Sequence, residues 1–113
     1  MLATYRSDIL DVMIDMNSYL MTKEDKTSDE LEIQEIVETY IPSFVNTNYQ
    51  GSLLNKMIVE CVGKLEYTII VHHVLLDAFL AEKWKQLRLI MLKSENDVTL
   101  ARPVARLYGE LHR

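Results

Sequence analysis

The stretch LEYTIIVHHVLLDAFLAEKWKQLRLIML, residues 65–92, decides the fold that we expect for this chain. It contains no glycine, no proline and no turn dipeptide. Apolar residues recur along it every three or four positions, which is the stripe of an amphipathic helix. We therefore predict a long apolar helix at about 65–92. Because most globular helices are shorter, two helices joined near Asp77 or Glu82 are the alternative.

The composition of the whole chain favours a single helical domain. Its 113 residues, 49 % of them hydrophobic and 26 % charged, are sufficient for one globular unit over 1–113. Three glycines and two prolines are too few for the turns of a many-stranded β fold. The expected fold is therefore all-α, a compact bundle of four or five helices around the long helix.

Repeats of the same kind predict further helices over about 7–21, over about 29–41, from about 52, and over about 98–112. Ser7 is the candidate N-cap of the first helix, and the second helix is expected to start after Ser28 or Asp29. Pro42 disfavours helical geometry at Ile41 and removes a backbone donor, so the second helix should end or kink there. The β-branched run at 68–71 would also suit a strand, but the surrounding pattern favours helix. The segments 22–29, 46–51 and 93–97 are expected to be loops.

Charge is distributed unevenly along the chain. The net charge of −5 divides into −7 over residues 1–60 and +2 over residues 61–113. An acidic chain does not favour nucleic-acid binding, which draws most of its affinity from lysine and arginine. The opposed halves would instead suit attraction within one bundle or between two copies.

The cellular setting is expected to be the cytoplasm, with no membrane partner. The first twenty residues carry three aspartates rather than a basic start and an apolar run. The longest apolar stretch, 69–81, is polar at three positions and shorter than the roughly 20 residues that a membrane span needs. The single Cys61 fits a reducing compartment, and its place on an apolar face predicts a buried, unreactive thiol.

Motifs for cofactor, metal or catalytic chemistry are not evident. No glycine-rich phosphate loop, zinc-binding Cys/His set, calcium loop or nucleophile elbow is present. His72 and His73 are adjacent, so on a helix they point about 100° apart and cannot readily chelate one ion. Asp8, Asp11 and Asp15 are interpreted as a solvated helix face. We therefore expect no metal and no cofactor.

One pair of residues points to an enzymatic alternative. Arg106 and His112 have the spacing R-x5-H on the last expected helix. This spacing resembles the Arg-x4-6-His motif of small helical ribonucleases of the HEPN type. The resemblance covers these two residues, and it departs from the motif at Leu107, where the family has a polar residue. It implies RNA cleavage by Arg106 and His112.

The favoured function is a non-enzymatic, regulatory or interaction module that binds another protein or itself through an apolar helix face. A helix that is apolar nearly all round must be buried, either centrally or by a partner. Trp84 sits in a basic cluster, which suits an interface anchor, yet it also continues the core stripe. The simplest assembly is a two-fold homodimer in which acidic residues near 32–38 meet basic residues near 83–88. The residues expected to contact the partner are His72, Leu76, Phe79, Trp84, Lys85 and Arg88.

Overall fold

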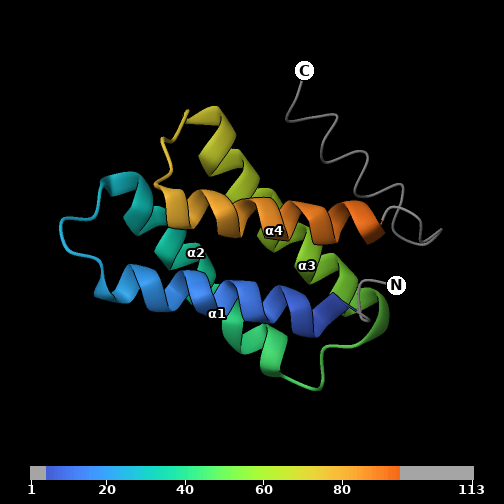
Figure 1. The fold of residues 1–113 in the computed structure, drawn as a ribbon. Helices are drawn as coiled ribbons and strands as arrows, with labels where there is room; N and C mark the ends of the chain where they lie inside the picture. Colours follow the sequence, from blue (N-terminus) through green and yellow to red (C-terminus); the bar gives the residue numbers. More distant parts are fainter. Residues whose placement is uncertain (1–4, 95–113) are drawn as a thin grey trace.

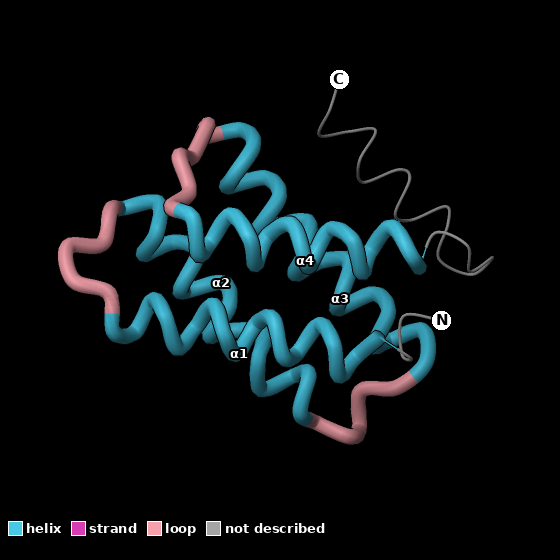
Figure 2. Tube along the Cα trace, viewed as in Figure 1, coloured by secondary structure: helices cyan, strands magenta, loops and turns pink. Residues whose placement is uncertain are grey.

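The structure of this chain, a computed structural model, describes residues 5–94. Within that range the chain is helical, without a strand (Figure 2). In order, its elements are α1 (Arg6–Thr22), α2 (Ser28–Val45), α3 (Gly51–Glu66), the π-helical turn η2 (Tyr67–Val71) and α4 (Ala78–Ser94). The all-α bundle is therefore confirmed. The helix expected over 98–112, together with Arg106 and His112, lies outside the described residues.

The helices form two layers, with α1 and α4 side by side in front of α2 and α3 (Figure 1). The α1 and α4 helices are antiparallel, because Asp77 at the start of α4 contacts Tyr19 near the end of α1, while Lys83 contacts Asp15. The α1 and α2 helices are antiparallel as well, since Arg6 reaches Phe44. The α2 helix also packs on α3 and η2.

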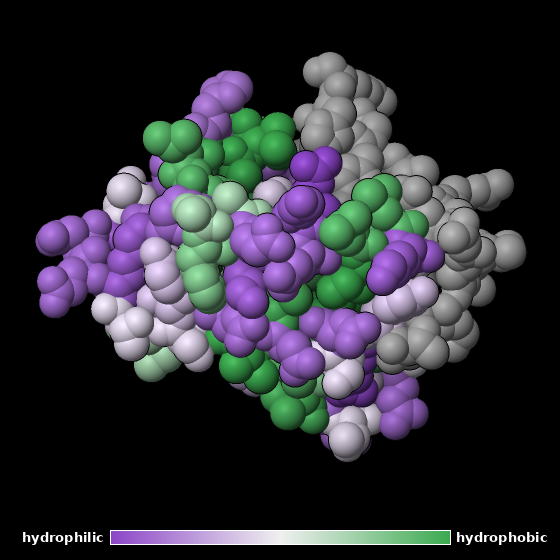
Figure 3. Space-filling model, in the orientation of Figure 1, coloured by the Kyte–Doolittle hydropathy of each residue, from purple (hydrophilic) through white to green (hydrophobic). Residues whose placement is uncertain are grey.

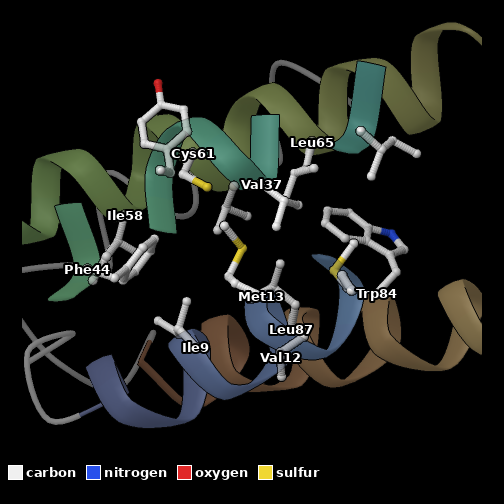
Figure 4. Packing of buried hydrophobic residues seen from close by; sticks show 14 of the residues in the cluster. Ile9, Val12, Met13, Val37, Phe44, Ile58, Cys61, Leu65, Trp84 and Leu87 are labelled. Carbon is white, nitrogen blue, oxygen red and sulfur yellow. The ribbon is translucent and has the colours of Figure 1, made fainter. Parts of the chain in front are cut away.

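The core is built from one stripe of each helix, at the spacing that the sequence predicts (Figure 4). Each fully buried aliphatic or aromatic side chain stabilises the fold by about 1.5–3 kcal/mol. Trp84 belongs to this stripe with 6 % of its surface exposed, and Cys61 is completely buried, as expected. The stripes are Ile9, Met13, Met16 and Leu20 of α1, Ile33, Val37 and Phe44 of α2, Leu54, Ile58, Cys61 and Leu65 of α3, and Leu80, Trp84, Leu87 and Met91 of α4.

The prediction of one helix over 65–92 is wrong, and the alternative of two helices joined near Asp77 is confirmed. The α3 helix passes into η2, and the chain then leaves helical geometry until Ala78. Two local features explain the break. The β-branched run at 68–71 weakens α-helical preference, although it forms a π-turn rather than a strand. Asp77 then begins a new helix, because its Oδ1 accepts the backbone N–H of Leu80 at 2.9 Å.

Four boundaries also differ from expectation. The α2 helix continues through Pro42 to Val45, where the Arg6 guanidinium donates to the carbonyl oxygens of Phe44 and Asn46, each at 2.6 Å. These bonds satisfy carbonyls at the helix end that would otherwise lack donors. The α2 helix starts at Ser28 with Thr27 as its N-cap, earlier than expected, and the N-cap of α1 is Tyr5 rather than Ser7. The α4 helix includes residues 93 and 94, which were expected to lie in a loop.

Among residues 5–94, no helix combines the length and apolar character needed to cross a bilayer.

Candidate interaction surface

The connection between η2 and α4, residues 72–77, is short and firmly held at its α4 end. Tyr19 donates its hydroxyl to Asp77 Oδ2 at 2.5 Å, and Lys23 Nζ donates to the same oxygen at 2.7 Å. Lys23 also pairs with Glu30, which is buried in the first turn of α2. One carboxylate therefore caps α4 and fastens it to the end of α1, and Lys23 extends the contact to α2.

The charges in this cluster are held in place by their partners. Burial alone would raise the pKa of Asp77, but bonds from the Leu80 N–H, Lys23 and Tyr19 outweigh it and lower that pKa to about 2. Burial likewise opposes ionisation of Glu30, whose pKa is nevertheless lowered by Lys23 and Thr27. Both carboxylates are thus charged at neutral pH, and their role is to hold helices together.

The other end of the connection is held by backbone hydrogen bonds. The N–H of Val74 donates to Ile69 at 3.0 Å, and the N–H of His73 donates to Ile70 at 3.2 Å. His73 has φ of 50°, in the left-handed region that non-glycine residues rarely adopt. Backbone hydrogen bonds therefore fix the start of the connection to η2, as Asp77 fixes its end to α1.

Leu75 lies in the middle of this fixed connection with 98 % of its surface exposed. A single exposed leucine needs no explanation, but further large apolar side chains near it in the sequence are exposed as well. Tyr67 and Val71 of η2 precede it, and Phe79 of α4 follows it. Phe79 also stacks on Tyr19, with ring centroids 4.3 Å apart. The fold thus presents an apolar segment at the start of α4.

A second row of exposed residues continues along α4, opposite its buried stripe. Its members are spaced four, three, four and three positions apart, the spacing of a helix–helix seam. Leu89 and Leu92 near its end are 48 % and 47 % exposed. Along α4, Figure 3 shows apolar colour toward both ends and polar colour between them. We call this row, with Leu75 before it, the outer face of α4; its helical members are Ala78, Glu82, Lys85, Leu89 and Leu92.

The residues expected to contact a partner occupy several different places. Lys85 lies on the outer face of α4. Leu76 packs partly against the core, and Arg88 is half-buried. Trp84 does not belong to this surface, because the stripe that it continues is the core of the bundle. Phe79 keeps 38 % of its surface exposed, while its ring stacks on Tyr19 of α1.

Leu75 and most of the outer face are not among the residues expected to contact a partner. The signal was present as a second row of spacing 4-3-4-3 on α4, shifted from the buried stripe. The row is hard to recognise in the sequence because the continuous periodicity of 65–92 favours one helix that is apolar nearly all round, buried either centrally or by a partner.

His72 lies away from the outer face, against the first turn of α2. Its Nδ1 is 3.8 Å from Asp29 Oδ1 and 3.8 Å from Glu32 Oε2. The ligand atoms of these three residues all lie within 4.8 Å of one another, so they could hold a metal ion. Among residues 5–94, this group does not include the adjacent His73.

The remaining residues considered in the sequence analysis are three aspartates of α1 and the single cysteine. Asp15 pairs with Lys83 at 2.8 Å, while Asp8 and Asp11 line an open groove between α1 and α4. Burial raises the pKa of the Cys61 thiol to about 12, so it is protonated and unreactive at neutral pH.

The fold and this surface define an all-α helical bundle with an exposed apolar and charged helix face. Comparison of the chain with protein-family models, curated proteins and solved structures finds no match in any of the three.

Proposed function

We propose that this protein is a non-enzymatic helical interaction module that binds a second copy of itself through the outer face of α4. The observation that carries the proposal is the order of residues on that face. Apolar side chains stand at both ends, and an acidic and a basic residue stand between them. Such an order is self-complementary when two copies of the helix meet antiparallel across a two-fold axis.

The pairing follows from the residue numbers. With the axis passing between Glu82 and Lys85, each Glu82 faces the partner's Lys85 and each Lys85 faces the partner's Glu82. In the same register Ala78 faces the partner's Leu89. Large side chains therefore meet small ones near the centre of the contact.

Leu75 belongs to the connection before α4, so the helical register does not assign it a partner residue. With 98 % of its surface exposed, it adds apolar surface at the end of the seam where the partner's Leu92 would lie. Apolar contacts would then close both ends of the seam, while the ion pairs occupy its middle.

The magnitude of this association is expected to be modest. The 17 residues of α4 span about 25 Å at 1.5 Å per residue, so a seam on this helix alone belongs to the small interfaces, below about 1,200 Å². Leucine burial supplies most of the free energy. The two exposed ion pairs contribute roughly 0–1 kcal/mol each and mainly set orientation. We expect a dissociation constant of about 1–100 μM, a weak and reversible homodimer.

A second copy explains the face better than an unrelated partner does. The outer face carries both members of each expected pair, an acidic with a basic residue and a small with a large apolar residue. A two-fold contact between identical surfaces requires this, whereas a contact with an unrelated protein does not. A reducing compartment such as the cytoplasm, where a weak dimer would respond to protein concentration, is part of the proposal and suits the free Cys61.

Sedimentation velocity from about 1 μM to about 1 mM tests the proposal. We expect a shift from monomer to dimer with concentration, and Leu92→Asp should abolish it. Leu53→Asp is the matched control, because Leu53 is 54 % exposed on α3, a different helix, and should dimerise as the wild type does.

A charge exchange tests the register itself. Glu82→Lys and Lys85→Glu should each weaken the dimer, because each places like charges opposite one another. The double variant restores opposite charges in the two-fold pairing and should recover the dimer. A wild-type chain that stays monomeric over the whole concentration range would refute the proposal and leave a different partner for this face.

A further inference from the structure

The cluster of Asp29, Glu32 and His72 lies where the first turn of α2 meets the end of η2. It combines two carboxylates with an imidazole from a segment far along the chain. The side chains are 40 %, 46 % and 39 % exposed, so an ion in solution can reach them. This cluster is separate from the outer face of α4 and is not used by the proposed dimer.

The distances are close to those of a metal site. Zinc binds histidine nitrogen and carboxylate oxygen at about 2.0–2.2 Å in a tetrahedral arrangement, which sets neighbouring ligand atoms about 3.4 Å apart. His72 Nδ1 lies 3.8 Å from each carboxylate oxygen. The three ligand atoms all lie within 4.8 Å of one another, so the exposed side chains would close by at most about 1.4 Å to form the site.

The carboxylates are positioned by the helix that carries them. Asp29 and Glu32 are three residues apart, so they lie on one face of α2. The preceding turn is fixed by a capping box, in which Thr27 Oγ1 accepts the N–H of Glu30 and Glu30 accepts the N–H of Thr27. The ligand pair therefore stands on a rigid element.

The imidazole and one carboxylate are oriented by η2. His72 is held by its backbone N–H, which donates to Thr68 at 3.3 Å, and the left-handed His73 follows it directly. The Thr68 hydroxyl donates to Glu32 Oε1 at 3.3 Å, which leaves Oε2 facing His72. Such an outer hydrogen bond to a ligating carboxylate is characteristic of metal sites, and π-turns are frequent at functional positions.

We propose that Asp29, Glu32 and His72 bind one zinc ion, with solvent completing its coordination. An imidazole with two carboxylates suits zinc or a similar transition ion, whereas calcium and magnesium select oxygen ligands alone. The ion would join the start of α2 to the connection before α4, two segments that the fold brings together.

Isothermal titration of the full-length chain with zinc chloride, in a buffer that does not chelate zinc, tests this site. We expect one zinc per chain at micromolar affinity and a rise in the thermal unfolding midpoint as zinc is added. His72→Ala and Glu32→Gln should each weaken binding by at least about tenfold and remove the thermal shift. Glu32→Gln preserves shape, so it separates loss of a ligand from loss of packing.

Two histidine variants are the matched controls. His73→Asn removes the neighbouring imidazole while retaining a residue that tolerates left-handed φ, and His112→Ala removes the remaining histidine of the chain. Both should bind zinc as the wild type does. Zinc binding that survives His72→Ala would overturn the assignment. So would a wild-type chain that binds no zinc at a zinc concentration of about 100 μM.

Discussion

The contribution of Asp77 to stability can be worked out from its two roles. Its carboxylate caps α4 through the Leu80 N–H, and it accepts bonds from Tyr19 and Lys23 that join α4 to α1. Asp77→Asn retains an oxygen that can cap the helix but removes the charge. Asp77→Ala removes both the cap and the charge. Comparison of the two variants therefore separates the two roles.

The expected magnitudes follow from the pKa and from the cap. A pKa of about 2 against the ordinary value of 3.8 corresponds to about 2.5 kcal/mol of stabilisation by the charge. Since 30 % of the Asp77 side chain is exposed, solvent screening reduces this to about 1–1.5 kcal/mol. Loss of an N-cap costs about 1 kcal/mol more. We expect losses of about 1–1.5 kcal/mol for Asp77→Asn and about 2–2.5 kcal/mol for Asp77→Ala.

The pH dependence gives a second check with a defined sign. The folded state lowers the pKa of Asp77, so the stabilisation is fully present above the unfolded value of 3.8 and is lost as pH falls toward about 2. Urea unfolding followed by circular dichroism at about pH 7, 4 and 3 measures this. The difference between wild type and Asp77→Asn should be constant from pH 7 to about 4 and smaller at pH 3. An unchanged difference at pH 3, or equal losses for Asn and Ala, would refute the assignment of charge and cap.

The remaining predictions concern the core, the caps and the enzymatic alternative. Trp84→Ala should destabilise the fold by about 3–5 kcal/mol in urea unfolding, whereas an interface anchor would leave monomer stability unchanged. The Cys61 thiol should resist a disulfide reagent in the native state and react fully in denaturant, as burial and its pKa of about 12 require. Thr27→Ala should cost about 1 kcal/mol and Ser28→Ala much less, because the cap is Thr27. The wild-type chain should leave labelled RNA intact; cleavage that disappears in His112→Ala would support the ribonuclease alternative instead.

The all-α fold and most of its core could be predicted from the sequence, because helical periodicity is a local property. A stripe such as Ile9, Met13, Met16 and Leu20 marks the buried face of its helix wherever that helix packs. The burial of Cys61 and the loop before α3 follow from the same pattern. The cap of α2 was also visible in the letters Thr-Ser-Asp-Glu at 27–30, although the helix was expected to start slightly later.

The outer face of α4 and the proposed zinc site could not be predicted in this way. Periodicity in 65–92 is continuous across the break, so the stripe alone could not show that the chain leaves the helix after η2. The break places Leu75 in solvent and lets α4 return along α1. Asp29 and Glu32 have no local relation to His72, and only the packing of η2 on α2 brings them together.

Sequence alone thus determined which faces of the helices are apolar, since burial of a helix face depends on residues three and four positions apart. Tertiary structure decided where helices end and what their outer faces meet. The end of α2 beyond Pro42 is held by Arg6, distant in the chain, which donates to the carbonyls of Phe44 and Asn46. Asp77 caps α4 through a local bond, but Lys23 and Tyr19 fasten that helix start to the end of α1. The bonds from Arg6, Lys23 and Tyr19 join residues far apart in sequence, and no local pattern encodes such a pairing.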